Sequence, residues 1–91
     1  MATEGAAPAE REIGKVTHFF SKINVGIIKL SEALRVGERI RFKGHTTDFT
    51  QPVASMQIEH ASIQTATVGQ SIGIRVADHA REHDVVYKVV D

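Results

Sequence analysis

The sequence has 91 residues, 42% of them hydrophobic and 24% charged, which allows one small folded domain and excludes a two-domain enzyme. Eleven Lys and Arg residues offset eleven Asp and Glu residues, so the bulk charge predicts affinity for neither nucleic acids nor membranes. The chain has no cysteine, which excludes disulfides, a thiol nucleophile and a thiolate zinc site. No apolar run approaches the roughly 18 residues of a membrane span, and no signal peptide is recognisable, so we predict a soluble cytoplasmic protein without membrane contacts.

The first twelve residues differ in texture from the rest of the chain. Residues 1–12 are small, acidic and proline-containing, and they offer too little apolar surface to offset the entropy of ordering. We therefore predict a disordered N-terminal tail over residues 1–12 and one folded domain over residues 13–91.

From Ile13 onward, short apolar runs alternate with turn residues at intervals of about ten, the spacing of an all-β barrel or sandwich. A looser apolar set occupies Ser62–Val68, and helical periodicity is weak throughout. The regular runs predict six strands, and they are Ile13–Phe20, Ile23–Leu30, Glu38–Lys43, Val53–His60, Ser71–Ala77 and Asp84–Val90.

Two of these runs show which side of the sheet faces the core. Ile40 and Phe42 alternate with three cationic residues, and Ile72, Ile74 and Val76 alternate with polar or small ones.

The run Val53–His60 predicts Ala54, Met56 and Ile58 on one face. The last run is apolar on both faces, so it should pair centrally. A closed barrel, in which the last strand removes the exposed edges, fits this pattern.

Several turns resemble a known domain. The segments Ile13-Gly14-Lys15-Val16, Leu34–Ile40 and Ala66–Ile74 are similar to the glycine-containing turns of the second domain of translational GTPases such as elongation factor Tu. Glu38 and Gln70 replace the aspartate that commonly follows each glycine in that domain. The resemblance implies a six-stranded closed β-barrel of the elongation-factor second-domain type.

A longer motif resembles the small elongation-factor-like proteins and the C-terminal barrel of the collagenase-type peptidase family. It runs from Gly44 through Thr46-Thr47-Asp48-Phe49 and Gln51 to Ser55–His60. The resemblance implies no activity, because the GTPase domain and the large peptidase domain are both absent from the sequence. The chain also lacks a G-x-x-x-x-G-K-[ST] loop, so we expect no nucleotide, no cofactor and no enzymatic function.

One short motif is typical of metallopeptidases. The segment His79-Ala80-Arg81-Glu82-His83 matches H-x-x-E-H, in which two histidines one helical turn apart hold zinc. Such a site needs a long helix and a third ligand, and this segment lies between two predicted strands. His18, His45 and His60 are scattered one per element. We therefore predict neither a metal site nor a catalytic residue.

The predicted strand Glu38–Lys43 carries a row of positive charges. Arg39, Arg41 and Lys43 project from one face at intervals of roughly 6.8 Å, comparable with successive phosphates along a nucleic acid strand. This row is the best candidate for contact with RNA. The alternative is a solvated strand face whose charges discourage pairing at the edge. Phe49, in the polar loop, is the one ring expected to be exposed for stacking.

Polar side chains follow this strand and form a second candidate surface. Thr47, Asp48, Phe49 and Gln51, with Ser55 and Gln57 further on, are expected on one side of the barrel. Uncharged polar groups of this kind suit recognition of a protein or an RNA. The alternative is that Asp48 and the threonines cap a turn.

The sequence thus predicts a non-catalytic binding module associated with RNA or with the translation apparatus. The alternative is a protein-interaction subunit that docks onto a separate catalytic chain of the peptidase or RNA-modifying type. RNA or ribosome-associated machinery and a protein partner are both retained as partners, and nucleotides and membranes are not.

Overall fold

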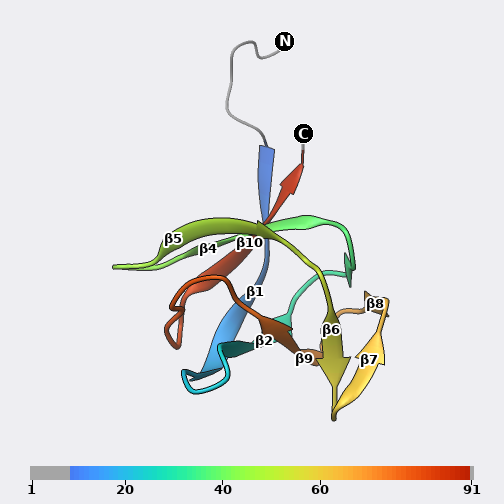
Figure 1. Cartoon of the computed structure of the whole chain (residues 1–91). Helices are drawn as coiled ribbons and strands as arrows, with labels where there is room; N and C mark the ends of the chain where they lie inside the picture. Colours follow the sequence, from blue (N-terminus) through green and yellow to red (C-terminus); the bar gives the residue numbers. More distant parts are fainter. Residues whose placement is uncertain (1–8, 91) are drawn as a thin grey trace, which may run out of the picture.

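The computed structural model describes residues 9–90, which form strands and turns with no helix. Figure 1 shows the strands wrapped around a common interior. Residues 9–90 contain ten strands. In chain order they are β1 (Ala9–Phe20), β2 (Val25–Leu30), β3 (Leu34–Arg35), β4 (Arg39–Lys43), β5 (Asp48–Pro52), β6 (Met56–Ile58), β7 (Ala61–Ile63), β8 (Thr65–Ala66), β9 (Ser71–Arg75) and β10 (Val85–Val90).

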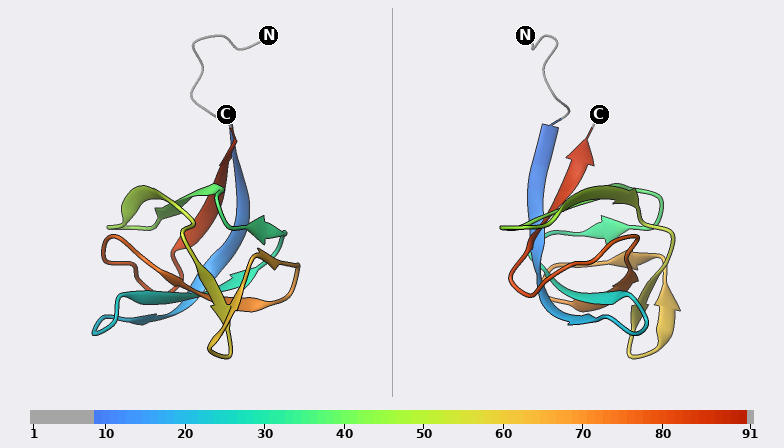
Figure 2. Two further views of the ribbon diagram at one scale, coloured as in Figure 1. Left: turned by 45° about the vertical axis from the view of Figure 1, so that its right-hand side comes forward. Right: turned by 60° about the vertical axis from the view of Figure 1, so that its left-hand side comes forward.

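The all-β prediction is confirmed, but the prediction of a closed six-stranded barrel is not. One eight-stranded sheet has the order β5-β4-β10-β1-β2-β9-β6-β7, and β3 pairs with β8 in a separate two-stranded sheet. The large sheet is rolled (Figure 2), but β5 and β7 remain its two edges. Backbone hydrogen bonds between Val53 and residues 37–38 and from Val36 to Gln64 bring the β3 segment against both ends of this sheet.

The roll of the sheet depends on β1, which pairs with β10 through its first half and with β2 through its second half. Its register shifts between Glu12 and Gly14 and again between Val16 and His18, and such irregularities bend a strand. Gly14 lies where β1 and β2 approach most closely, because a Cβ there would lie 2.5 Å from the Lys29 carbonyl oxygen. A glycine at this position therefore permits the bend.

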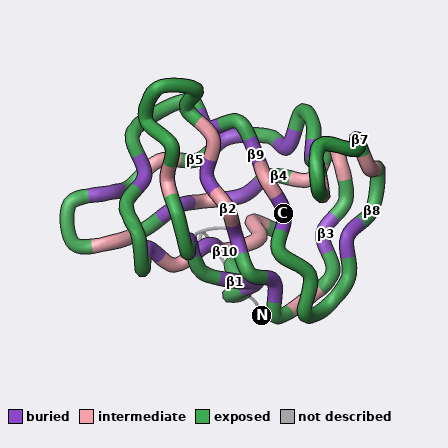
Figure 3. Tube along the Cα trace, turned by 90° about the horizontal axis from the view of Figure 1, so that it is seen from below, coloured by how far each residue is buried: buried purple, intermediate pink, exposed green. Residues whose placement is uncertain are grey.

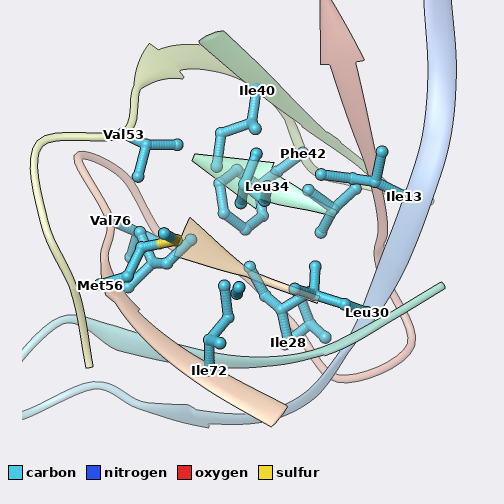
Figure 4. Close-up of a cluster of buried hydrophobic side chains, with 14 of the residues drawn as sticks. Ile13, Ile28, Leu30, Leu34, Ile40, Phe42, Val53, Met56, Ile72 and Val76 are labelled. Carbon is cyan, nitrogen blue, oxygen red and sulfur yellow. The ribbon is translucent and has the colours of Figure 1, made fainter. Parts of the chain in front are cut away.

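The core is a single cluster of aliphatic side chains with one phenylalanine. Figure 4 shows these side chains converging from the strands on both sides of the interior, and Figure 3 shows buried and exposed positions alternating along the chain. The alternation predicted for β4 and β9 is confirmed. The buried residues are Ile13, Val16, Ile28, Leu30, Leu34, Ile40, Phe42, Val53, Met56, Ala66, Ile72, Ile74, Val76, Ala80 and Val86.

The predicted strand Val53–His60 is broken in the structure, and the looser apolar run after it divides in two. Within Val53–His60, only Met56–Ile58 is a strand, and Ala54, predicted to be buried, is exposed. Val53 leaves the ladder of β5 to bond with the backbone of Glu38, so residues 53–55 turn the chain instead of extending a strand. The run Ser62–Val68 likewise divides into β7 and β8, and Val68 is exposed.

The first strand begins earlier than predicted. Residues 9–12, expected to belong to the disordered tail, are part of β1 and pair with Tyr87–Val90 of β10. Arg11 adds an ion pair to Glu32 at 3.1 Å. Charged residues can extend an existing strand when their backbone has a partner, so their low hydrophobicity did not prevent pairing. Residues 1–8 of the predicted tail lie outside the described residues.

Candidate functional site

The cationic row on β4 is present, but its central member is neutralised. Arg39, Arg41 and Lys43 alternate with buried Ile40 and Phe42, as predicted. Arg41 makes two hydrogen bonds of 2.8 Å to the carboxylate of Asp48 on β5. It also reaches across β10 to Glu10 on β1, with Nη1 3.0 Å from Oε2.

The paired carboxylates hold Arg41 strongly in its charged form. The hydrogen bonds that Arg41 donates to Asp48, and then those to Glu10, raise the pKa of Arg41 above its ordinary value. In return, the hydrogen bond from Arg41 lowers the pKa of Asp48. A guanidinium that already binds two carboxylates has few donors left for a phosphate, so this row is a poorer match for an RNA backbone than its sequence suggests.

Two half-buried side chains of β10, Tyr87 and Val89, lie between the cationic residues of β4 and the acidic residues of β1. Tyr87 lies opposite Arg41 on one side and Glu12 on the other. Val89 lies in the same way between Arg39 and Glu10. Apolar residues flanked by charges of both signs are typical of a surface that binds proteins.

The predicted polar loop is in part a strand, because β5 begins at Asp48, and its residues have mainly a structural role. Thr47 is buried, and its carbonyl accepts a hydrogen bond of 2.8 Å from the Gly44 amide. Phe49 is half-buried and stacks on Phe42, with ring centroids 4.8 Å apart, so the expectation of an exposed ring is wrong. The carboxylate of Asp48 already accepts hydrogen bonds from Arg41.

Gln51 also serves the fold. It is nearly buried, its Nε2 donates to the Arg75 carbonyl, and its Oε1 accepts from the Ala77 amide. The sequence did not distinguish this role from partner binding, because no strand was predicted over these residues, whereas in the structure Gln51 is a buried residue of β5 opposite buried Ile40.

The structure separates Ser55 and Gln57 from the other predicted residues and places them in a groove. Two adjoining hollows, of about 370 and 290 Å³, share the lining residues Ile23, Val25, Gln57 and Gly73. We call them together the hairpin groove. Ser55 and Arg75 line one end, and Phe20, Ile27, Glu59, His60 and Ser71 complete the other.

The apolar wall of this groove was missed at the level of sequence. Phe20 and Ile23 flank the turn between β1 and β2 and are 49% and 56% exposed. Large apolar residues beside a tight turn, where polar residues are usual, are the signal that could have indicated a binding surface.

The H-x-x-E-H segment is a loop and turn rather than a helix. The imidazole of His79 packs edge-on against Phe19 with centroids 4.6 Å apart, and Glu82 lies 3.7 Å from Nδ1 of His18. His83 has a φ of 76° and donates its amide to the Val16 carbonyl. Within residues 9–90, no three His, Asp or Glu side chains are grouped so as to hold a metal ion.

Known proteins with related sequences are peptidases by name. The chain is 38% identical over 87 residues to an uncharacterised protease of Methanocaldococcus jannaschii, and 31% identical over 86 residues to a collagenase of Porphyromonas gingivalis. Each match covers 92% of this chain but 21% of the relative, so the chain spans about a fifth of the length of these proteins. No protein-family model matches the sequence.

The fold agrees with these matches. It is similar to the crystal structure of the C-terminal domain of a Geobacillus thermoleovorans protein assigned to the U32 peptidases, with a TM-score of 0.81. That match covers 86% of this chain and 91% of the solved domain at 17% identity. A selenomethionine variant of the same domain gives a TM-score of 0.79 at 16% identity, covering 84% of this chain and 96% of that one.

These matches correct the resemblance drawn from the turns. The collagenase-type part is supported, whereas a translational identity and an association with RNA are not. The relatives are named as proteases, but their names do not support catalytic activity in a stretch that is a fifth of their length. Among residues 9–90 there is no helix of a length and hydropathy that would cross a bilayer.

Proposed function

We propose that this chain is a non-catalytic protein-interaction module that docks onto a peptidase-type catalytic domain. The observation that carries the proposal is the extent of the match, which covers nearly all of this chain and about a fifth of each protease. In those proteins the same stretch therefore accompanies a remainder four times larger, which has room for an active site and a surface to dock on.

The surface of the module supports the same function. The hairpin groove combines exposed aromatic and aliphatic side chains with polar groups at its rim, the composition of a protein interface. The exposed members of the predicted site, Arg39, Lys43, Ser55 and Gln57, belong to this proposed binding role. Thr47 and Gln51, which are buried, contribute to it only by holding the fold.

RNA binding, the first interpretation of the cationic row, has less support because Arg41 is held between Glu10 and Asp48. The two interpretations differ in their dependence on salt. Contacts to phosphates weaken steeply as the salt concentration rises, whereas docking through apolar side chains changes little. An affinity for a single-stranded RNA that falls steeply as the salt concentration rises and is weakened by Arg41→Ala would favour RNA.

A chimaera tests docking directly. The region of the P. gingivalis collagenase that this chain matches is replaced by the chain, and unfolding is followed by differential scanning calorimetry beside the isolated chain. Docking predicts that the module unfolds at a higher temperature in the chimaera, because an interface stabilises the folded state. Unfolding at the same temperature in both settings, or cleavage of gelatin by the isolated chain, contradicts the proposal.

A further inference from the structure

The outer surface of β2, β9 and β6 forms a small grid that defines the hairpin groove. Gly73 in the middle of β9 pairs with Ile27 on one side and Gln57 on the other. The β2 register places Arg75 beside Val25 and Ser71 beside Lys29. From the β6 side, Ser55 lines the same hollow as Arg75, and Glu59 lines the same hollow as Ser71. The two ends of the groove therefore carry different residues.

The depth of the groove comes from Gly73. A Cβ at this position would lie 3.5 Å from both Ile27 Cδ1 and Val25 Cγ1, in ordinary contact. A side chain would thus fit sterically and fill the floor between the β2 and β6 rows. The missing side chain opens a channel along β9, between apolar residues of β2 and the polar edge of β6.

The charges at the two ends differ. Arg75 is exposed, and its side chain makes no hydrogen bond or ion pair with any residue of the described part of the chain. At the other end, Glu59 and Lys29 carry opposite charges near Ser71. The Arg75 end is thus the cationic one, and a carboxylate is the group that complements it.

We infer that the hairpin groove binds an extended segment of the partner peptidase domain whose apolar side chains contact Ile23 and Ile27 and whose carboxylate pairs with Arg75. This inference rests on the proposed function, and it names the surface and the chemistry of the partner. Four residue steps of extended chain separate Ser71 from Arg75, about 13 Å, so a segment of five residues spans the groove. Alternation places its first, third and fifth side chains toward the module.

Three synthetic peptides, each measured for binding to the full-length chain, test this chemistry. Each is amidated at its C-terminus and carries fluorescein on its N-terminal amine, with the sequence Leu-Ser-Leu-Ser followed by Glu, Gln or Lys. Fluorescence anisotropy should show the Glu peptide binding about 1.5-fold to fivefold more tightly than the Gln peptide, the range of an exposed ion pair. The Lys peptide should bind most weakly.

Variants of the groove test its residues. Arg75→Glu should reverse the order of the Glu and Lys peptides, and Ile23→Ser should weaken all three. Arg35→Glu and Val68→Ser are matched controls, because they make the same kinds of change at exposed positions outside the groove. Equal binding of the three peptides to the native chain, or an unchanged order with Arg75→Glu, would overturn the inference.

The chimaera separates this inference from the proposed function. If the module is stabilised in the chimaera and Arg75→Glu with Ile23→Ser removes that stabilisation, both stand. If the double variant remains fully stabilised, docking stands and the hairpin groove is not its surface. If the Glu peptide binds selectively but the chimaera shows no stabilisation, the groove still binds an apolar segment with a carboxylate, and the proposed docking fails.

Discussion

The side-chain amide of Gln51 forms the hydrogen bonds of a strand partner with the backbone around Ala77. Its Oε1 lies 2.6 Å from the Ala77 amide nitrogen, and its Nε2 lies 2.9 Å from the Arg75 carbonyl oxygen. β5 and β9 are not neighbours in the sheet, so this one side chain joins an edge strand to the segment that leaves β9.

We expect Gln51→Ala to lower the free energy of unfolding by about 1–3 kcal/mol, because two part-buried hydrogen bonds of about 0.5–1.5 kcal/mol each are lost. Gln57→Ala is the matched control, since Gln57 is exposed. Urea denaturation followed by circular dichroism measures both variants. Equal stabilities would show that the Gln51 bonds do not hold the fold together.

Gly44 lies directly beneath the carboxylate of Asp84. A Cβ on residue 44 would overlap Oδ1 of Asp84. Asp84 is buried and its Oδ2 accepts a hydrogen bond of 2.8 Å from the Arg81 amide, so it cannot move without losing that bond. Gly44→Ala should therefore cost about 1–3 kcal/mol of stability, as overpacking does.

Gly26→Ala serves as the comparison for Gly44→Ala, because a Cβ at Gly26 meets only Val76 Cγ1, at 3.7 Å. The melting temperature of Gly44→Ala should be well below that of Gly26→Ala in thermal unfolding. The reverse order would mean that Asp84 adjusts freely.

The ion pair of Arg41 with Asp48 predicts a dependence of stability on pH. The pKa of Asp48 is lower in the folded protein than its ordinary value of 3.8, so the pair stabilises the fold above that pH. The contribution is lost as the pH falls through the folded-state pKa. Asp48→Asn should therefore have a lower free energy of unfolding than the native chain at pH 7. The difference between the two free energies should become smaller in acid.

Denaturation in urea at neutral pH and in acid tests the Asp48 prediction. Thr50→Ala, on the same exposed edge strand, should show no such narrowing. A gap between Asp48→Asn and the native chain that is independent of pH would contradict it.

Zinc should not stabilise this protein through the H-x-x-E-H segment. His79 packs on Phe19, and Glu82 faces His18, so the three side chains of the motif do not converge. Equimolar zinc should leave the melting temperature of the native chain and of a His79→Ala, His83→Ala double variant equally unchanged. A rise in melting temperature confined to the native chain would show that the loop rearranges to bind metal.

Periodicity predicted the strands whose two faces differ most. β4 and β9 each have one favourable orientation, because the opposite one would bury a charge. In β4 the inner residues Ile40 and Phe42 alternate with Arg41. In β9 the inner residues Ile72 and Ile74 alternate with Arg75. The central position of β10, between β4 and β1, likewise follows from its apolar residues on both faces.

The openness of the sheet and the groove could not be predicted in this way. Both depend on where strands stop: Val53 bonds to Glu38 rather than continuing a strand, and the ladder between β6 and β9 consists of one residue pair, Gln57 with Gly73. Such choices are made by contacts between segments distant in the sequence. The same holds for Arg41, whose partner Glu10 belongs to a segment predicted to be a tail.

The pairing of Ala9 with Val90 brings the first and last described strands side by side. Figure 1 places the start of β1 and the end of β10 together at the pole opposite the β6–β7 turn. A module with this geometry can be spliced into a loop of a larger host, or circularly permuted, without stretching either junction. A polypeptide joined there would leave the β6–β7 turn, at the opposite pole, uncovered.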